Sequence, residues 1–195
     1  MLTPSHFLMT AVIDKSFPRI PIVKSAFLLG SVAPDLPLWF LSIGSLIYYH
    51  FLKNWSLSDS FHLIFDELYF HNPFWIASHN LLHSPIFLLF SLRLLWRSRR
   101  NIGSPSRWFF WFLVACLLHS FVDIFTHADD GPLLFFPLEW SIRFHSPISY
   151  WNFQYYGREF RIFEYSLNAV FLLYLFGSRF CRYLRSLMPS YAPNS

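Results

Sequence analysis

Charged side chains are scarce in this chain of 195 residues, because aspartate, glutamate, lysine and arginine together make up only 13% of it. An ordinary soluble domain contains roughly 25% of these residues. Hydrophobic residues account for 54% instead, including 25 phenylalanines and 8 tryptophans. This composition argues against a soluble globular protein. It indicates a protein embedded in a membrane, of a length suited to one domain.

Acidic residues are the rarer charge, with 11 against 15 basic residues and a formal net charge of +4 at pH 7. A basic excess can mark a nucleic-acid-binding protein, but such proteins carry their basic residues in a stripe on a polar surface. Here the arginines stand at the ends of apolar runs, where they set the orientation of membrane helices. We therefore predict a lipid bilayer as partner and no nucleic acid.

Cysteine is also rare, since only Cys116 and Cys181 occur, far apart and in apolar segments. Such cysteines usually act as small hydrophobic residues, which argues against a disulfide framework and a redox site. The first residues lack the positive charge, apolar core and small-residue cleavage site of a signal peptide. We therefore expect the mature chain to start at Met1.

Apolar runs, prolines and polar breaks predict an all-α fold, an integral membrane helical bundle. We expect about three to four membrane helices plus short N-terminal helices. The predicted helices cover residues 3–17, 22–32, 36–52, 56–70, 74–96, 108–125 and 163–177. Residues 1–188 are predicted to form a single helical membrane domain with the functional site, and residues 189–195 a disordered tail.

Two pairs of polar side chains are spaced one helical turn apart in strongly apolar surroundings: His79 with His83, and His119 with Asp123. Residues i and i+4 share a helix face, with Cβ atoms about 6 Å apart, so both side chains can reach one ion. Alone in an apolar segment, each would cost several kcal/mol unless something satisfied it. A shared divalent cation is the simplest partner. Imidazole and carboxylate suit zinc, with manganese or iron as alternatives.

Simpler explanations stay open at this point. A hydrogen bond between helices would satisfy His119 and Asp123, and chance would explain the spacing of His79 and His83. Asp35, between two prolines, would serve as a solvated turn residue, and His6 as a surface histidine. Four further carboxylates are candidates for catalytic or supporting roles, although no spacing selects one: Asp129, Asp130, Glu139 and Glu164. Four histidines without a partner at metal spacing are interpreted as structural: His50, His62, His71 and His145.

Several motifs occur in the same order as in a known family. They are Thr3-Pro4-Ser5-His6, Gly30-Ser31-Val32-Ala33-Pro34-Asp35, His79 with His83-Ser84, His119-x-x-x-Asp123-x-x-Thr126, and Gly131-Pro132-Leu133-Leu134-Phe135-Phe136-Pro137. Together they resemble the YdjM-like membrane-bound metal-dependent hydrolases, a family distantly related to zinc-dependent phospholipase C. The H-x-x-x-D-x-x-T block with its downstream Leu-Leu-x-x-Pro is the most specific part.

The resemblance implies an all-helical fold in which these histidines and aspartates gather one or more metal ions. Carried over by position, the implied ligands are His6, Asp35, His79, His83, His119 and Asp123, with His127 as a further one. Asp123 would bridge two ions, and we assign it the catalytic role. Because position 149, four residues after His145, is a serine and not the glutamate of the phospholipase pattern, we expect a mono- or dinuclear site.

Arginines at residues 97–107 and 179–185 are placed in the cytoplasm by the positive-inside rule. The loop after Asp123, and with it the site, then lies on the exoplasmic side of a bacterial inner or plasma membrane. The first 35 residues fit this arrangement less well, because they hold two candidate site residues and also basic ones. The basic residues are Lys15, Arg19 and Lys24.

The predicted function is that of a membrane-bound, phospholipase C-like hydrolase. It would cleave a phosphoester or other ester bond of a lipid or amphiphilic substrate through metal-activated water. One alternative is a metal or proton transporter whose path is lined by the same side chains. Another is a structural membrane protein without an ion. The sequence specifies neither the substrate nor an oligomeric state.

Overall fold

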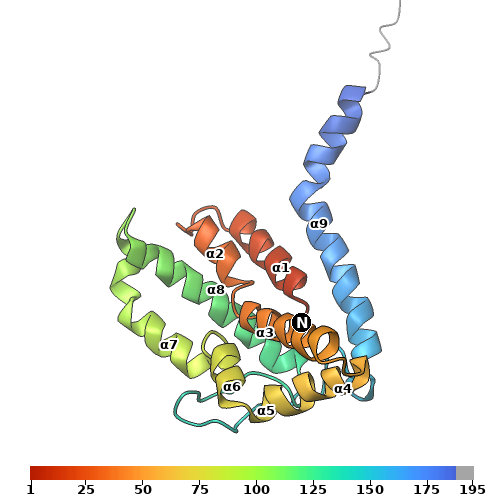
Figure 1. The fold of residues 1–195 in the computed structure, drawn as a ribbon. Helices are drawn as coiled ribbons and strands as arrows, with labels where there is room; N and C mark the ends of the chain where they lie inside the picture. Colours follow the sequence, from red (N-terminus) through yellow and green to blue (C-terminus); the bar gives the residue numbers. More distant parts are fainter. Residues whose placement is uncertain (188–195) are drawn as a thin grey trace, which may run out of the picture.

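The computed structural model describes residues 1–187, and its regular structure is helical (Figure 1). No strand occurs within this range, although Leu133 and Arg143 form one isolated antiparallel bridge. The predicted all-α class is therefore confirmed. The predicted tail, residues 189–195, lies outside the described residues.

Two short N-terminal helices form a hairpin, α1 (Thr3–Ser16) and α2 (Lys24–Gly30). Pro4 suits the first turn of α1, where its missing N–H is harmless. α2 packs against the long helix α8 (Pro105–Thr126), and Gly30 makes their close approach possible. A Cβ at Gly30 would lie 2.2 Å from the carbonyl oxygen of Phe112. The hairpin thereby brings the end of α2 to the middle of α8.

The main body of the molecule is a row of helices in contact with one another: α7 (Pro85–Leu94), α8, α2, α1 and α9 (Gly157–Leu187) (Figure 1). Within residues 1–187, two segments are long and apolar enough to cross a membrane, Pro105–Thr126 and Gly157–Ser178. Half of the first is buried inside the protein, whereas the second is almost wholly exposed along its length. α9 thus presents an apolar surface that a bilayer would cover.

The number of candidate spans is smaller than the three to four predicted. The apolar run at residues 74–96 divides into α6 (Pro73–Asn80) and α7, because Pro85 disfavours a helical Ser84 and cannot donate a backbone hydrogen bond. The run at residues 36–52 forms α3 (Leu36–Leu46) followed by the π-helix η1 (Ile47–Leu52). Neither run forms a continuous helix of the about 20 residues that a crossing needs.

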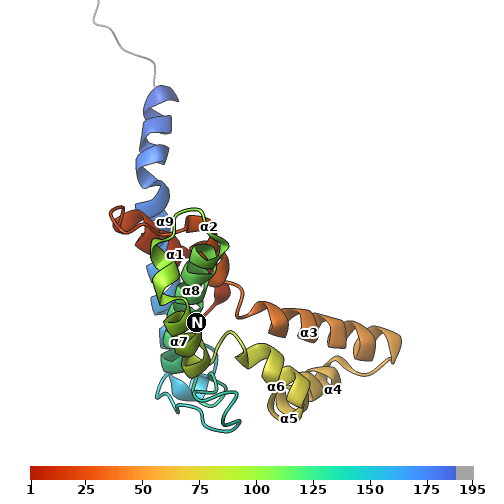
Figure 2. The same ribbon diagram turned by 90° about the vertical axis from the view of Figure 1, so that its left-hand side faces the viewer.

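Residues 36–71, which we call the arm, project to one side of the main body (Figure 2). After α3 and η1 the chain returns through α4 (Leu57–His62), the π-helix η2 (Leu63–Leu68) and α5 (Tyr69–His71). α3 contacts α4, η2 and α6, but none of its residues is fully buried. Its Phe40 is 72% exposed. The arm is therefore an apolar projection with an open surface.

A long loop, residues 127–152, covers the C-terminal end of α8 before the short 3₁₀ turn η4 (Phe153–Tyr155) leads into α9. Ser84 donates its hydroxyl to the carbonyl of Phe136 at 2.7 Å, and the amide of Tyr150 donates to the carbonyl of Thr126 at 2.9 Å. Leu133 and Phe136 pack on Ile76 in a small buried cluster. The loop is thus fixed to α6, α7 and α8 around one end of the bundle.

Candidate metal centre

His119 and Asp123 lie one turn apart near the C-terminal end of α8. Nε2 of His119 is 2.9 Å from Oδ2 of Asp123. Both residues are buried, at 1% and 3% exposed. The i to i+4 spacing puts the two side chains on one helix face. That face points toward α2 and the turn before α7.

His83 lies in the turn between α6 and α7. The prediction that it shares a helix face with His79 is wrong, because α6 ends at Asn80 and the amide of His83 donates to the Asn80 carbonyl at 3.2 Å. The turn follows from Pro85, which ends helical geometry just before it. Ser120 of α8 donates its hydroxyl to the carbonyl of His83 and fixes the turn on α8.

Asp35 enters the same place from the junction of α2 and α3. Its Oδ1 is 3.4 Å from Nε2 of His119 and 3.5 Å from Nε2 of His83. The hydroxyl of Thr3, at the start of α1, donates to the other carboxylate oxygen, Oδ2. Thr3 therefore orients the carboxylate, and α1 itself has no side-chain cap.

Backbone carbonyls determine which ring nitrogen of two histidines carries a proton. Nδ1 of His83 lies 2.8 Å from the carbonyl oxygen of His79, and Nδ1 of His119 lies 2.8 Å from that of Ser31. Because a carbonyl oxygen only accepts, each Nδ1 must be the donor, and a neutral ring then has a bare lone pair on Nε2. The two Nε2 atoms are 3.2 Å apart. Their lone pairs face each other, as in histidines that share a metal ion.

Four side chains therefore offer donor atoms to one point. One ligand atom from each of Asp35, His83, His119 and Asp123 lies within 4.8 Å of the others. The two carboxylates carry negative charge that a divalent cation would balance. The oxygen and nitrogen donors fit zinc, manganese or iron and include no thiolate. These four residues could thus hold a divalent metal ion.

The pKa of Asp35 shows how strongly its surroundings favour the ionised carboxylate. Burial raises this pKa, but the neighbouring rings of His119 and His83 outweigh burial and hold the pKa well below its usual range. Asp35 is therefore an anion at physiological pH. An ionised carboxylate among buried rings is ready to bind a cation.

His6, in the first turn of α1, contacts Asp123 and does not belong to the group of four. Its Nε2 is 2.9 Å from Oδ1 of Asp123, and its ring stacks on that of His119 with 3.7 Å between centroids. Burial lowers the pKa of His6 to about 4, although the carboxylate of Asp123 opposes this shift. A neutral His6 donates Nε2–H to Asp123. It thereby orients that carboxylate without adding a charge.

The N-terminal segment also supports Asp123. The amino group of Met1 donates to Oδ1 of Asp123 and to Oγ1 of Thr126, each at 2.8 Å. The amide of Leu2 donates to Oε1 of Glu164 on α9 at 2.7 Å, and Glu164 is completely buried. α9 therefore holds this segment against the end of α8. Oδ1 of Asp123 is occupied by donors, whereas Oδ2 faces the histidines.

His79 and His127 flank the four donors. The ring centroid of His79 is 4.2 Å from that of His83, and its Nδ1 is buried without a partner among the described residues. His127 donates Nδ1–H to the carbonyl of Asp123 at 3.0 Å. Burial lowers the pKa of both rings, so that both are uncharged. The structure thus places four of the implied ligands in one group: Asp35, His83, His119 and Asp123. The other three, His6, His79 and His127, lie around this group. The ligand roles themselves stay predictions.

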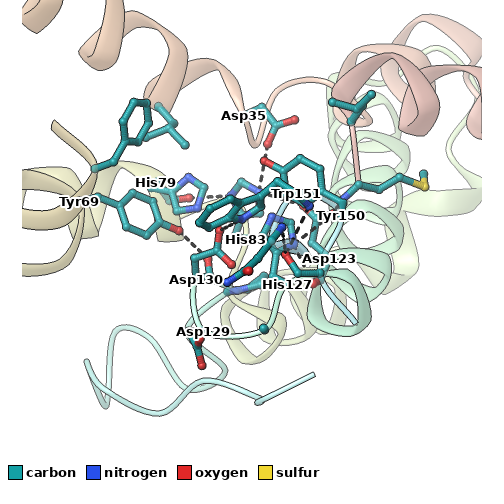
Figure 3. A pocket seen from close by; sticks show the side chains of 18 of the residues that line it. Asp35, Tyr69, His79, His83, Asp123, His127, Asp129, Asp130, Tyr150 and Trp151 are labelled. Carbon is teal, nitrogen blue, oxygen red and sulfur yellow. Dashed lines mark hydrogen bonds and ion pairs between the residues drawn. The ribbon is translucent and has the colours of Figure 1, made fainter. Parts of the chain in front are cut away.

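A cavity of about 850 Å³ lies beside the four donors (Figure 3). Figure 3 shows Asp35, His83 and Asp123 on one side of it and Tyr69 on the other. Tyr69 donates its hydroxyl to the carbonyl of Asp130 at 2.7 Å, and Nε1 of Trp151 donates to Oδ2 of Asp130 at 2.8 Å. Apolar side chains of the arm complete the wall: Leu38, Trp39, Phe61, Phe65 and Phe70.

Several residues that hold the site in place were not selected from the sequence. Ser120 could have been selected from the sequence, because a hydroxyl next to His119 in an apolar helix needs a hydrogen-bond partner. The same holds for Asn80, whose side-chain oxygen accepts from the amide of Leu133 at 2.8 Å. The contact of Met1 with Asp123 joins positions 122 apart and has no local signal.

Comparison with known protein families identifies one family that this chain matches. The sequence model of the YdjM inner membrane protein family matches residues 1–184, a range that includes every residue of the site. Neither the curated proteins nor the solved structures give a match. The two apolar helices fit an inner membrane protein. The chain therefore belongs to the YdjM inner membrane protein family.

Proposed function

We propose that this protein is a metal-dependent hydrolase of the inner membrane. The proposal rests on one observation, the two opposed Nε2 atoms 3.2 Å apart between two carboxylates. A proton on His119 would satisfy its contact with Asp123, but Asp35 would remain 3.4 Å and 3.5 Å from the two nitrogens, without a short hydrogen bond. A divalent cation satisfies all four side chains at once.

A divalent cation bound there would lower the pKa of a coordinated water to about 7 and polarise a phosphoryl or acyl oxygen. The protein's own side chains have separate tasks. His6 and the amino group of Met1 fix Oδ1 of Asp123, so that Oδ2 is presented to the cation. His127, neutral and at the cavity wall, is placed to accept and return a proton at Nε2, since its Nδ1 is engaged.

Two carboxylates that the sequence offered as catalytic groups have other contacts. Glu164 binds the amide of Leu2, and Asp129 pairs with His145 at 2.7 Å on the surface. Asp130 lines the cavity and accepts from Trp151. Proton transfer is therefore assigned to His127 rather than to Glu164 or Asp129.

The substrate class follows from the two walls of the cavity. One wall carries the polar cluster, and the other carries apolar side chains of the arm, among them Trp39 and Phe65. An amphiphile would place its ester next to the four donors and its hydrocarbon chain along the arm. Burial raises the pKa of Tyr150, which therefore keeps its proton and can donate to an ester or phosphate oxygen, whereas the hydroxyl of Tyr69 already donates to the carbonyl of Asp130. A phosphoester of a lipid is the substrate we favour.

The proposed orientation puts the site on the exoplasmic side. The turn between α1 and α2 lies beside the first turn of α8, where Arg107 donates to the carbonyl of Pro21 at 2.6 Å. Lys15 donates to the carbonyl of Tyr174, near the end of the α9 span, at 2.6 Å. The basic residues of the first 35 therefore share one end of the bundle with the arginines of residues 97–107. This removes the conflict with the positive-inside rule, and the site lies at the opposite end.

The test is ester turnover by the full chain, purified in detergent and supplied with zinc, manganese or iron. A panel of phosphomonoesters, phosphodiesters and carboxylic esters of short-chain lipids provides the substrates. We expect turnover to depend on the metal. We expect His119→Ala to reduce it by more than the about 10–100-fold typical of residues outside the ligand shell.

His145→Ala is the matched control, because His145 pairs with Asp129 on the exposed loop and lies outside the cavity. It should keep turnover close to that of the wild type. Equal losses in His119→Ala and His145→Ala would contradict the site. Metal flux into proteoliposomes without turnover of any ester would contradict the hydrolase and favour a transporter.

A further inference from the structure

A second cavity, of about 640 Å³, lies at the opposite end of α8 from the metal centre, and we call it the basic cavity. It is bounded by the turn after α1, the 3₁₀ helix η3 (Trp96–Arg100) and the first three turns of α8. Three arginines and several large apolar side chains line it: Arg99, Arg100, Arg107, Ile20, Trp96, Ile102, Phe110 and Trp111. This combination of cationic and aromatic walls is absent from the metal centre.

Two donors in the lining have no acceptor within the part of the chain that the structure describes. They are Nε of Arg107 and Nε1 of Trp111, and both atoms are buried. A buried N–H without a partner costs about 1–3 kcal/mol, so that such donors are usually satisfied by a ligand or water. A ligand with several acceptor oxygens would supply what these residues lack.

Positive charge in the basic cavity is not balanced by the protein. No acidic residue occurs in the sequence between Glu67 and Asp123, a stretch that contains all three arginines. Within residues 1–187 none of these arginines forms an ion pair: Arg99 donates to the carbonyl of Trp96 at 2.7 Å, and Arg107 donates to that of Pro21. The ligand that balances this charge must therefore be an anion.

We propose that the basic cavity binds the phosphate group of an anionic membrane phospholipid. Guanidinium groups bind phosphate through paired, charge-assisted hydrogen bonds. The N-terminal turn of α8, which begins at Pro105, adds the positive end of its helix dipole beside Arg107. Phosphate oxygens would accept hydrogen bonds from Arg100, Arg107 and Trp111.

The apolar part of the lining selects a lipid over a free phosphate. Trp96, Ile102 and Trp111 would contact glycerol and acyl carbons, and Ile102 is 89% exposed. Basic pockets at the cytoplasmic side of membrane helices are known binding places for anionic headgroups. An inorganic phosphate would leave these apolar side chains uncovered and should bind more weakly.

The experiment measures lipid binding by the full chain in non-ionic detergent, using native mass spectrometry. The probes are phosphatidylglycerol, phosphatidylcholine and inorganic phosphate. Phosphatidylglycerol should bind saturably with a defined stoichiometry, and more tightly than either of the other two. Arg100→Gln and Arg107→Gln should each raise its Kd about tenfold, the equivalent of about 1.4 kcal/mol.

Arg97→Gln is the matched control, since Arg97 belongs to the same 3₁₀ helix but does not line the cavity. It should leave the Kd within about twofold, as expected for an exposed charge. Arg100→Gln carries the test if Arg107→Gln misfolds, because Arg107 also binds the α1–α2 turn. Unchanged phosphatidylglycerol binding in Arg100→Gln would overturn the site. Inorganic phosphate binding as tightly as the lipid would overturn the lipid as its ligand.

Discussion

The metal centre can bind a cation only if His83 and His119 are in the right tautomer. His83 and His119 direct their bare Nε2 atoms at each other only because carbonyls of His79 and Ser31 hold the Nδ1 protons. Those carbonyls belong to a turn and to the end of a helix, so the local backbone controls the donor set. Side chains that fix the backbone or a carboxylate should therefore matter almost as much as the ligands.

Thr3→Val tests the support of Asp35. It keeps the shape of the side chain and removes the hydroxyl that donates to Oδ2 of Asp35. We expect metal affinity to fall about 10–100-fold, because outer-shell partners usually contribute that much. The measurement is competition with a chelating dye of known affinity.

Thr10→Val is the control for that substitution. Thr10 lies on the same helix, is also buried, and donates to the carbonyl of His6 within α1. Its loss should lower stability without a comparable loss of metal. A similar fall in affinity for both variants would mean that the effect comes from α1 as a whole.

Local spacing predicted part of the site, and long-range packing created the rest. His119 and Asp123 were found because one helix positions both. His6 and Asp35 entered through the family resemblance, since no local rule joins them to α8. The contact between Leu2 and Glu164 spans 162 positions, so it depends on the docking of α9.

The packing of α2 on α8 is the contact between elements that most directly shapes the site. Gly30 ends α2 in close contact with Phe112, and the next residue, Ser31, provides the carbonyl that orients His119. A larger separation of these helices would move that carbonyl away from His119. Helix packing and the histidine tautomer are therefore linked.

Gly30→Ala should separate the two helices, because the added Cβ would lie 2.2 Å from the Phe112 carbonyl oxygen. We expect a loss of stability of about 1–3 kcal/mol, typical of overpacking, together with weaker metal binding. The measurement combines the Tm in detergent with the metal content. Gly44→Ala on α3 is the control, since no atom lies within 4 Å of its added Cβ. It should be neutral or stabilise the helix by about 0.5–1 kcal/mol, and the opposite ranking would contradict this account.

Elements with a clear pattern were predictable, and the count of membrane spans was not. The helices near residues 108–125 and 163–177 were found, and the structure extends both. The run at residues 74–96 was predicted to form one crossing, but Pro85 divides it into two helices. The turn between these helices places His83 beside α8. A hydropathy pattern alone does not show whether an apolar run crosses a bilayer or forms an arm.

At the scale of the whole molecule, charge is unevenly distributed along the bundle. Lys15, Arg19, Lys24 and the arginines of residues 97–107 lie at the end with the α1–α2 turn, whereas Arg143, Arg158 and Arg161 lie at the site end. The carboxylates Asp35 and Asp123 also lie at the site end, with most of the acidic residues of the arm and the loop after α8. This distribution is the basis for placing the metal centre on the exoplasmic side.

Cysteine labelling tests the orientation. Leu138→Cys lies in the exposed loop at the site end, and Asn101→Cys lies in the exposed loop at the basic end. In a Cys181→Ser background, a membrane-impermeant maleimide should label Leu138→Cys in intact spheroplasts and Asn101→Cys only after lysis. The reverse pattern would place the metal centre in the cytoplasm.

The convergence of four side chains on one cation is tested most directly by elemental analysis of the purified chain beside Asp123→Asn. The wild type should retain zinc, manganese or iron in stoichiometric amount through dialysis, and Asp123→Asn should lose most of it while remaining folded. No stoichiometric metal in the wild type, or the same content in both proteins, would contradict the metal centre.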